Sequence, residues 1–116
     1  MTFNVEVLLK GKEHVVDESV HLDGPDASEW ADDDVRRILT LTLGIYDKVL
    51  NPSAETRSVS MQGFSWIVTP ADGGVAIAIE VSTGVVVAGP FDADADELTA
   101  TIQRVLANRA GGDRVH

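Results

Sequence analysis

Three short apolar segments follow one another in the second half of the chain: Gly63-Phe-Ser-Trp-Ile-Val68, Val75-Ala-Ile-Ala-Ile-Glu-Val81 and Val85-Val-Val-Ala88. Glycine, proline, aspartate and serine separate them, which is typical of tight turns between strands. An amphipathic segment that ends near Asn108 comes next. The pattern predicts three consecutive strands and a helix, with Gly84 supplying a positive φ at the last turn.

The first segment is predicted to bend. Val59 and Met61 share one alternation phase, whereas Phe64, Trp66 and Val68 share the opposite phase. Gly63 lies where the phase changes, as expected for a bulge in one long strand over residues 56–69. A turn over residues 69–73 then leads into the second segment.

The N-terminal residues alternate in the same way. Apolar residues occupy every second position, at Phe3, Val5, Val7 and Leu9, and the positions before Leu8 that lie between them are polar. This alternation predicts a half-buried strand. A turn at Gly11-Lys12 would return the chain as a second strand, with Val7 opposite Val16 and Phe3 opposite Val20. The same register places Glu6 opposite Asp17, an unfavourable like-charge pair, so we expect this second strand to lie at an edge or to be irregular.

A helix is expected between Asp26 and Asn51. Its apolar stripe is formed by Val35, Ile38, Leu39, Thr42, Ile45, Tyr46 and Val49. The start has two alternatives: a capping box of Asp26 and Glu29, or a later start in which Trp30 packs on Val35 as a hydrophobic staple. In the later start, Asp32, Asp33 and Asp34 lie at the positive end of the helix. Leu41, Leu43 and Leu50 lie off the stripe, so the helix is buried on two sides or contacts a partner.

The last helix is expected to begin at Asp94, with Glu97 completing a capping box. Its stripe is Leu98, Ile102, Val105 and Leu106. We expect residues 1–110 to form a single domain and residues 111–116 to form a disordered tail.

These elements together predict an α+β fold with about five antiparallel strands and two helices in the order ββαβββα. We place both helices on one face, because the small residues Ala76 and Ala78 suit a surface better than a core. This order resembles the roadblock and longin type of small α/β domain. The resemblance implies a dimerising or scaffolding module, and it extends only to the fold.

The composition limits the chemistry. The 116 residues carry a net charge of −10 and contain no cysteine. Nine carboxylates and no lysine or arginine lie between Glu13 and Asp34, which disfavours binding to nucleic acid or to an anionic membrane surface. The first residues do not have the pattern of a signal peptide, and no apolar stretch is long enough to span a membrane, so we expect a cytoplasmic protein.

No motif predicts a cofactor or a metal. Asp92-Ala-Asp94-Ala-Asp96 resembles the opening of a calcium loop, but Glu97 and Gln103 replace the glycine and glutamate that such a loop requires. His14, His21 and His116 lack the spacing of a zinc site. Ser65 lies within a strand pattern and not in a nucleophile turn.

The leading hypothesis is therefore a non-enzymatic interaction or regulatory domain that forms a homodimer, through a sheet edge or through the face of Leu41, Leu43 and Leu50. The first alternative is an acidic inhibitor or immunity-type protein that binds a basic partner surface. Candidate residues for partner binding are Trp30, Asp32, Asp33, Asp34, Leu41, Leu43 and Leu50. The second alternative is a ligand-binding protein or enzyme with a pocket between the first helix and Gly63.

Overall fold

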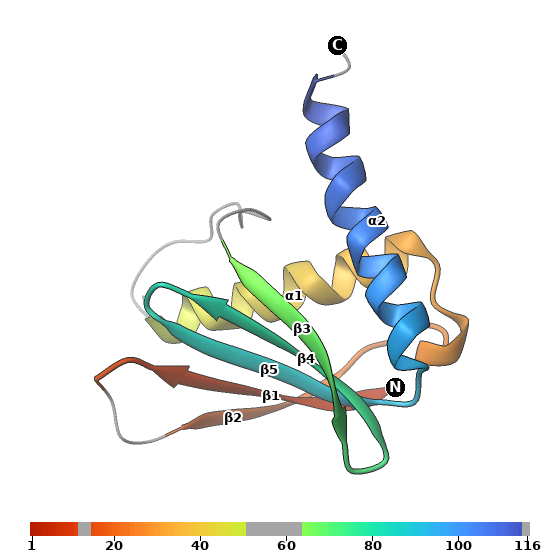
Figure 1. Ribbon diagram of the computed structural model, residues 1–116. Helices are drawn as coiled ribbons and strands as arrows, with labels where there is room; N and C mark the ends of the chain where they lie inside the picture. Colours follow the sequence, from red (N-terminus) through yellow and green to blue (C-terminus); the bar gives the residue numbers. More distant parts are fainter. Residues whose placement is uncertain (12–14, 51–63, 115–116) are drawn as a thin grey trace.

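The computed structural model describes residues 1–11, 15–50 and 64–114. Its strands are β1 (Thr2–Leu9), β2 (Val16–His21), β3 (Ser65–Ala71), β4 (Gly74–Val81) and β5 (Gly84–Phe91). The helices are η1 (Ala27–Glu29), a 3-10 turn, α1 (Asp32–Leu50) and α2 (Ala95–Arg114). The five strands form one antiparallel sheet, and α1 and α2 are the two helices (Figure 1). The predicted α+β class and element order are therefore confirmed.

The strand order across the sheet is β2-β1-β5-β4-β3. The predicted register of the first hairpin is confirmed: Val7 pairs with Val16, and Glu6 lies opposite Asp17. β2 is an edge strand, as the like-charge pair indicated, and only Val20 in it is partly buried.

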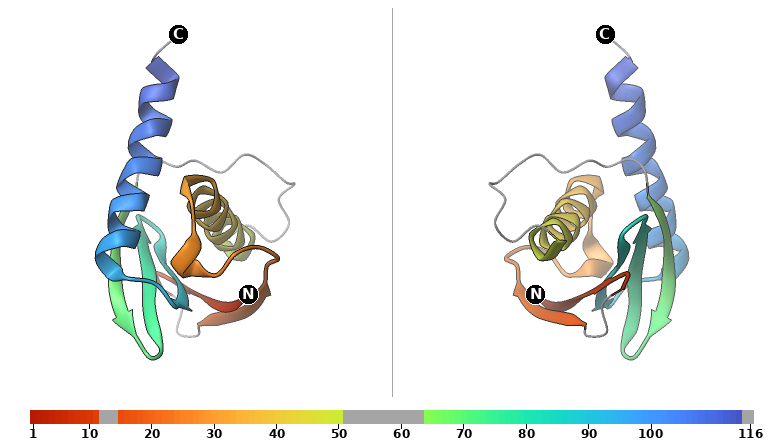
Figure 2. Two further views of the ribbon diagram at one scale, coloured as in Figure 1. Left: turned by 90° about the vertical axis from the view of Figure 1, so that its right-hand side faces the viewer. Right: turned by 90° about the vertical axis from the view of Figure 1, so that its left-hand side faces the viewer.

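One face of the sheet is buried under both helices, and we call it the inner face. Its most deeply buried side chains, at most 1% exposed, include Val5, Val7, Ile77, Ile79 and Val86. These residues belong to a single hydrophobic cluster with residues of α1 and α2. The sheet curves around α1, and the last turns of α2 extend beyond the other elements (Figure 2). The prediction that both helices share one face is therefore confirmed.

α1 has the later of the two predicted starts. The side chain of Asp34 accepts a hydrogen bond from the Ala31 N–H at 2.9 Å. Asp26 instead precedes η1 and makes no side-chain cap there. The buried positions of α1 are Val35, Ile38, Leu39, Thr42, Leu43 and Tyr46.

The predicted apolar stripe on α1 omitted one residue of the core, Leu43. Leu43 is 6% exposed and belongs to the core, whereas Ile45 and Val49 are only partly buried. Leu43 lies four residues after Leu39 and three before Tyr46, so it shares their side of the helix.

The hairpins of β3, β4 and β5 differ in detail from the expectation. β3 continues through Pro70 to Ala71. Proline has no backbone N–H to donate, and it is tolerated here because β3 is an edge strand. The prediction of a positive φ at Gly84 was wrong, since the described positive-φ glycines do not include it. Gly84 is needed for space, because a Cβ there would meet the Leu8 carbonyl oxygen and the Tyr46 hydroxyl.

β5 contains a bulge that brings Phe91 into the core. Val75 pairs with Phe91 and Ile77 pairs with Ala88, so Gly89 and Pro90 together face the single residue Ala76. The strand therefore continues past Gly89-Pro90 to Phe91, beyond the apolar segment over residues 85–88 that the sequence indicated. Phe91 is 1% exposed and contacts the ring of Phe3 at a centroid distance of 5.0 Å.

α2 begins as predicted. The Glu97 N–H donates to the Asp94 carboxylate at 3.0 Å, and Leu98, Ile102 and Val105 are buried. The helix continues to Arg114 and so includes residues 111–114, which the sequence had placed in the tail. The expected strand before residue 64 and the bend at Gly63 lie outside the described residues. None of the described helices has the length and apolar content needed to span a membrane.

We predict that Phe91→Ala lowers the free energy of unfolding by about 3–5 kcal/mol, because it removes a buried aromatic side chain. The matched control is Ile67→Ala, which truncates an exposed side chain and should change the free energy of unfolding by less than about 0.5 kcal/mol. Chemical denaturation monitored by circular dichroism measures both values. Equal effects of the two substitutions would contradict the assignment of Phe91 to the core.

Candidate functional site

The three aspartates at the start of α1 each have a partner within the protein. Asp32 forms a bidentate ion pair with Arg104 of α2, with nitrogen–oxygen distances of 2.7–3.0 Å. Asp33 pairs with Arg36 at 3.1 Å. Asp34 caps the helix and approaches Arg37 at 3.6 Å. Asp32 therefore links the two helices, while the other two stabilise the first turns of α1.

The ion pair changes the pKa of both partners. Hydrogen bonding and the positive charge of the Arg104 guanidinium hold the pKa of Asp32 below its usual value. The Asp32 carboxylate correspondingly raises the pKa of Arg104. The pair is partly exposed to solvent, so the link between α1 and α2 is screened by water and salt.

Two contacts fix the position of the Trp30 side chain, a hydrogen bond and a contact between aromatic rings. Its Nε1–H donates to the carbonyl oxygen of Pro25 at 3.2 Å. Its ring meets the ring of Phe91 edge-on, at 5.0 Å and 64°. Trp30 directly precedes Ala31, the last residue before α1, and remains partly exposed. The side chain is thus anchored to the core and also presents surface to solvent.

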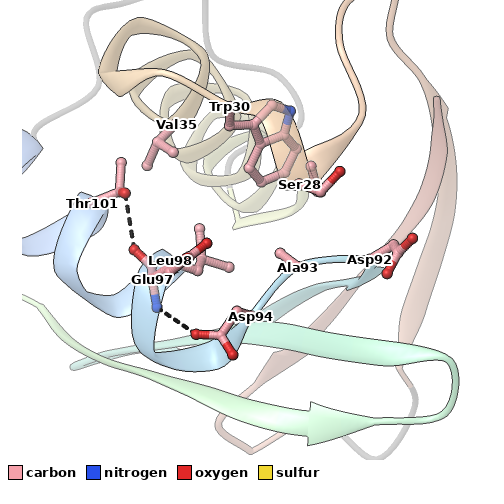
Figure 3. A pocket seen from close by; sticks show the side chains of 10 residues that line it. Ser28, Trp30, Val35, Asp92, Ala93, Asp94, Glu97, Leu98 and Thr101 are labelled. Atoms are coloured by element: carbon pink, nitrogen blue, oxygen red, sulfur yellow. Dashed lines mark hydrogen bonds between the residues drawn. The ribbon is translucent and has the colours of Figure 1, made fainter.

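A cavity of about 230 Å³ lies beside Trp30, between the start of α1 and the start of α2. It is lined by Ala27, Ser28, Trp30, Val35, Asp92, Ala93, Asp94, Glu97, Leu98 and Thr101. Figure 3 shows Trp30 on one side and the Asp92–Glu97 segment on the other. The predicted residue Trp30 is therefore at the cavity, whereas the three aspartates of α1 do not line it.

The polar groups of the cavity are only partly used within the protein. The Asp94 carboxylate accepts from the Glu97 N–H, and the Glu97 carbonyl oxygen accepts from the Thr101 hydroxyl at 2.9 Å. Among the described residues, the Asp92 and Glu97 carboxylates have neither a hydrogen bond nor an ion pair. An aromatic ring opposite free carboxylates is an arrangement that suits a cationic group.

The described residues contain no group of three or more acidic, histidine or cysteine side chains that could hold a metal ion. Among the carboxylates of this segment, that of Asp94 has a structural use, since it caps α2. The sequence did not predict that they border a cavity, because Trp30 is more than sixty positions away and no local motif connects the two segments.

The three leucines of α1 that we proposed as a contact face do not form one surface. Leu43 is buried in the core and cannot contact a partner from outside. Leu41 is partly buried against the core, and Leu50 is 36% exposed at the end of the helix. Leu50 is the only one of the three that is exposed.

Two exposed large apolar side chains of the described strands lie instead on the side of the sheet away from the helices, which we call the outer face. Ile67 is 60% exposed there and Leu8 is 43% exposed. The strand register connects them through half-buried neighbours: Leu8 pairs with Val85, Val87 with Ala78, and Ala78 with Ile67. The sequence indicated this surface only indirectly, through strands β4 and β5 that are apolar in both phases.

No protein-family model, curated protein or solved structure was found to match this chain.

We predict that Asp32→Asn destabilises the protein at neutral pH, because it removes the ion pair between the helices. The pKa of Asp32 is lowered in the folded state, so its contribution is present above the unfolded value of about 3.9 and is lost as the pH falls through the lower folded value. Denaturation midpoints measured between neutral and acidic pH should therefore converge for the wild type and the variant at acidic pH.

The control is Asp33→Asn, which removes the same charge from the same helix end but breaks only a pair within α1. It should have the smaller effect at neutral pH. A difference between wild type and Asp32→Asn that stays constant down to acidic pH would contradict the assigned role of Asp32.

Proposed function

We propose that this chain is a small non-enzymatic interaction domain that binds a protein partner on the outer face of its sheet. The observation that supports the proposal is an apolar row on this face, in which Leu8 and Ile67 are exposed and the residues between them, Val85, Val87 and Ala78, are half-buried. A contiguous apolar patch on a soluble domain typically marks a binding surface.

The surroundings of the row have the composition of an interface rim. Glu6 lies next to Val87, and Glu80 lies next to Val85 and opposite Ser65. All three polar side chains are exposed. An apolar centre bordered by polar groups is the usual arrangement at protein–protein contacts.

The helical side offers less surface for docking. The apolar side chains of both helices are largely used in the core, and the charged groups at the start of α1 are paired with arginines. Removing water from the outer face would cost little, because its central side chains make no polar contacts that must be broken.

The absence of cysteine allows a direct test with single thiols. Ser65→Cys places a thiol at the border of the outer face without changing the apolar row, and Thr40→Cys places one on an exposed position of α1. Alkylation rates are measured for dilute purified protein, for concentrated protein and in an extract of the source cells. We expect slower alkylation of the Ser65→Cys thiol, and not of the Thr40→Cys thiol, whenever a partner occupies the face.

Equal ratios of the two rates under all three conditions would contradict the proposal. The readout does not depend on the identity of the partner, because occlusion of the face by any protein slows the reaction.

A second candidate function is recognition of a basic side chain from a partner by the cavity beside Trp30. The volume of about 230 Å³ is smaller than the roughly 300–1,000 Å³ of typical ligand pockets and suits one long side chain. A lysine or arginine there would face the ring of Trp30 and the carboxylates of Asp92 and Glu97. The net charge of −10 would favour the approach of a basic partner.

For this candidate we predict that the double substitution Asp92→Asn/Glu97→Gln weakens binding of a short lysine-rich peptide, measured by tryptophan fluorescence at low salt. The control Asp17→Asn/Glu18→Gln removes the same two charges from β2, far from the cavity in the sheet order. The cavity variant should bind several-fold more weakly than the control, because it removes two exposed ion pairs with the bound cation that are worth about 0.2–1 kcal/mol each. Equal weakening by both variants would indicate a non-specific charge effect and contradict the candidate.

A further inference from the structure

We infer that the edge strand β2 binds an extended basic segment of a partner protein, which adds to the sheet as a further strand. This edge is a different surface from the outer face, so the inference goes beyond the proposed function and does not depend on it. Three observations carry it: backbone groups that point out of the sheet, carboxylates without a basic partner, and apolar side chains that remain exposed at the same edge.

The backbone of β2 presents hydrogen-bonding groups along the edge. The Leu22 N–H donates to the Met1 carbonyl oxygen at 2.9 Å, and the Met1 ammonium donates to the Leu22 carbonyl oxygen at 3.1 Å. In an antiparallel ladder, such hydrogen-bonded pairs alternate with pairs that are not hydrogen-bonded. The N–H and C=O groups of Asp17, Ser19 and His21 therefore point away from β1, toward the side where no other described strand lies.

The opposite edge of the sheet is less suited to pairing. That edge is β3, which carries Pro70 without an N–H and is contacted by α2. β2 has neither proline nor glycine, and only Val20 among its side chains is partly buried (Figure 1). An extended segment can therefore pair with β2 along its length, as in other complexes that form by addition of a strand.

The charges at β2 favour a basic occupant. Glu6 of β1 lies directly opposite Asp17, and Glu18 points to the other face of the sheet. Among the described residues, these three carboxylates have no basic partner. Like charges in direct opposition are unfavourable, so a lysine or arginine beside Asp17 would offset a repulsion that the free protein retains. A second copy of this chain, with its net charge of −10, would add to that repulsion.

The side chains of β2 also indicate the sequence that fits. Val16 is 36% exposed although its partner Val7 is buried. Apolar residues opposite Val16 and Val20, and basic residues opposite Asp17 and Glu18, would form favourable cross-strand pairs. An antiparallel segment with these properties has the order apolar, polar, basic, basic, apolar from its N-terminus.

The probe is the N-acetylated, C-amidated peptide Thr-Val-Thr-Lys-Lys-Val, whose first residue lies opposite His21 in this register. Two N-methylated forms of equal charge separate backbone pairing from attraction between charges. Methylation of the first, third and fifth residues removes the N–H groups that would donate to β2. Methylation of the second, fourth and sixth residues removes only N–H groups that point away from it.

Binding is followed by amide NMR of the full chain at low salt. The unmodified peptide should shift the amide signals of Asp17, Ser19 and His21 and slow their hydrogen exchange, because these N–H groups become bonded. The form methylated at the first, third and fifth residues should bind at least about tenfold more weakly than the other form, since it loses several hydrogen bonds.

The test variant of the protein is Asp17→Asn/Glu18→Gln, which should weaken binding of the unmodified peptide several-fold. The matched control is Asp72→Asn/Glu29→Gln, which removes the same number of charges from exposed positions on other elements and should change the dissociation constant by less than about twofold. Circular dichroism confirms that both variants remain folded. The signals are resolved by residue, so a lysine bound in the cavity is recognised by shifts around Trp30 instead.

Three results would overturn the inference. The first is equal affinity of the two N-methylated forms, and the second is equal weakening by the two double variants, since either would indicate a non-specific charge effect. The third is a shift of the same β2 amides when the protein alone is concentrated, because β2 would then pair with a second copy.

Discussion

Burial of the inner face of the sheet is the constraint on which the remaining structure depends. Val5, Val7, Ile79 and Val86 are almost completely removed from water, and α1 and α2 both contribute to the cluster that covers them. Because both helices lie on that side, the Asp32 carboxylate meets the Arg104 guanidinium across the helix pair. The same arrangement leaves the outer face without a helical cover among the described elements. The placement of both helices on the inner face therefore produces both the core and the candidate docking surface.

Much of the fold could be predicted from local patterns. The register that pairs Val7 with Val16 follows from a period of two and a short turn, and it is found in the structure. The start of α2 directly after Asp94 follows from capping chemistry, whereas for α1 the sequence left two starts open and the structure has the later one. The misplacement of Leu43 arose because a wide apolar stripe has no sharp border in sequence, and only packing against the sheet decides which residue is buried.

The candidate sites were harder to predict, because they depend on contacts between distant segments. Trp30 and Asp94 come to line one cavity only after β5 has crossed the sheet and α2 has begun beside α1. The outer row likewise joins Leu8 of β1 to Ile67 of β3, although its apolar character was visible as a second phase in Val85 and Val87. A strand that is apolar in both phases indicates a second buried surface but does not identify what covers it.

The one-sided cover of the sheet can be measured directly by methyl NMR of dilute monomeric protein with a soluble paramagnetic agent. The account predicts strong relaxation enhancement for the methyl groups of Ile67 and Leu8, and almost none for those of Ile79 and Val86. Similar enhancement in the two pairs, or protection of Ile67 in the monomer, would contradict it, because the outer face would then be covered within a single chain.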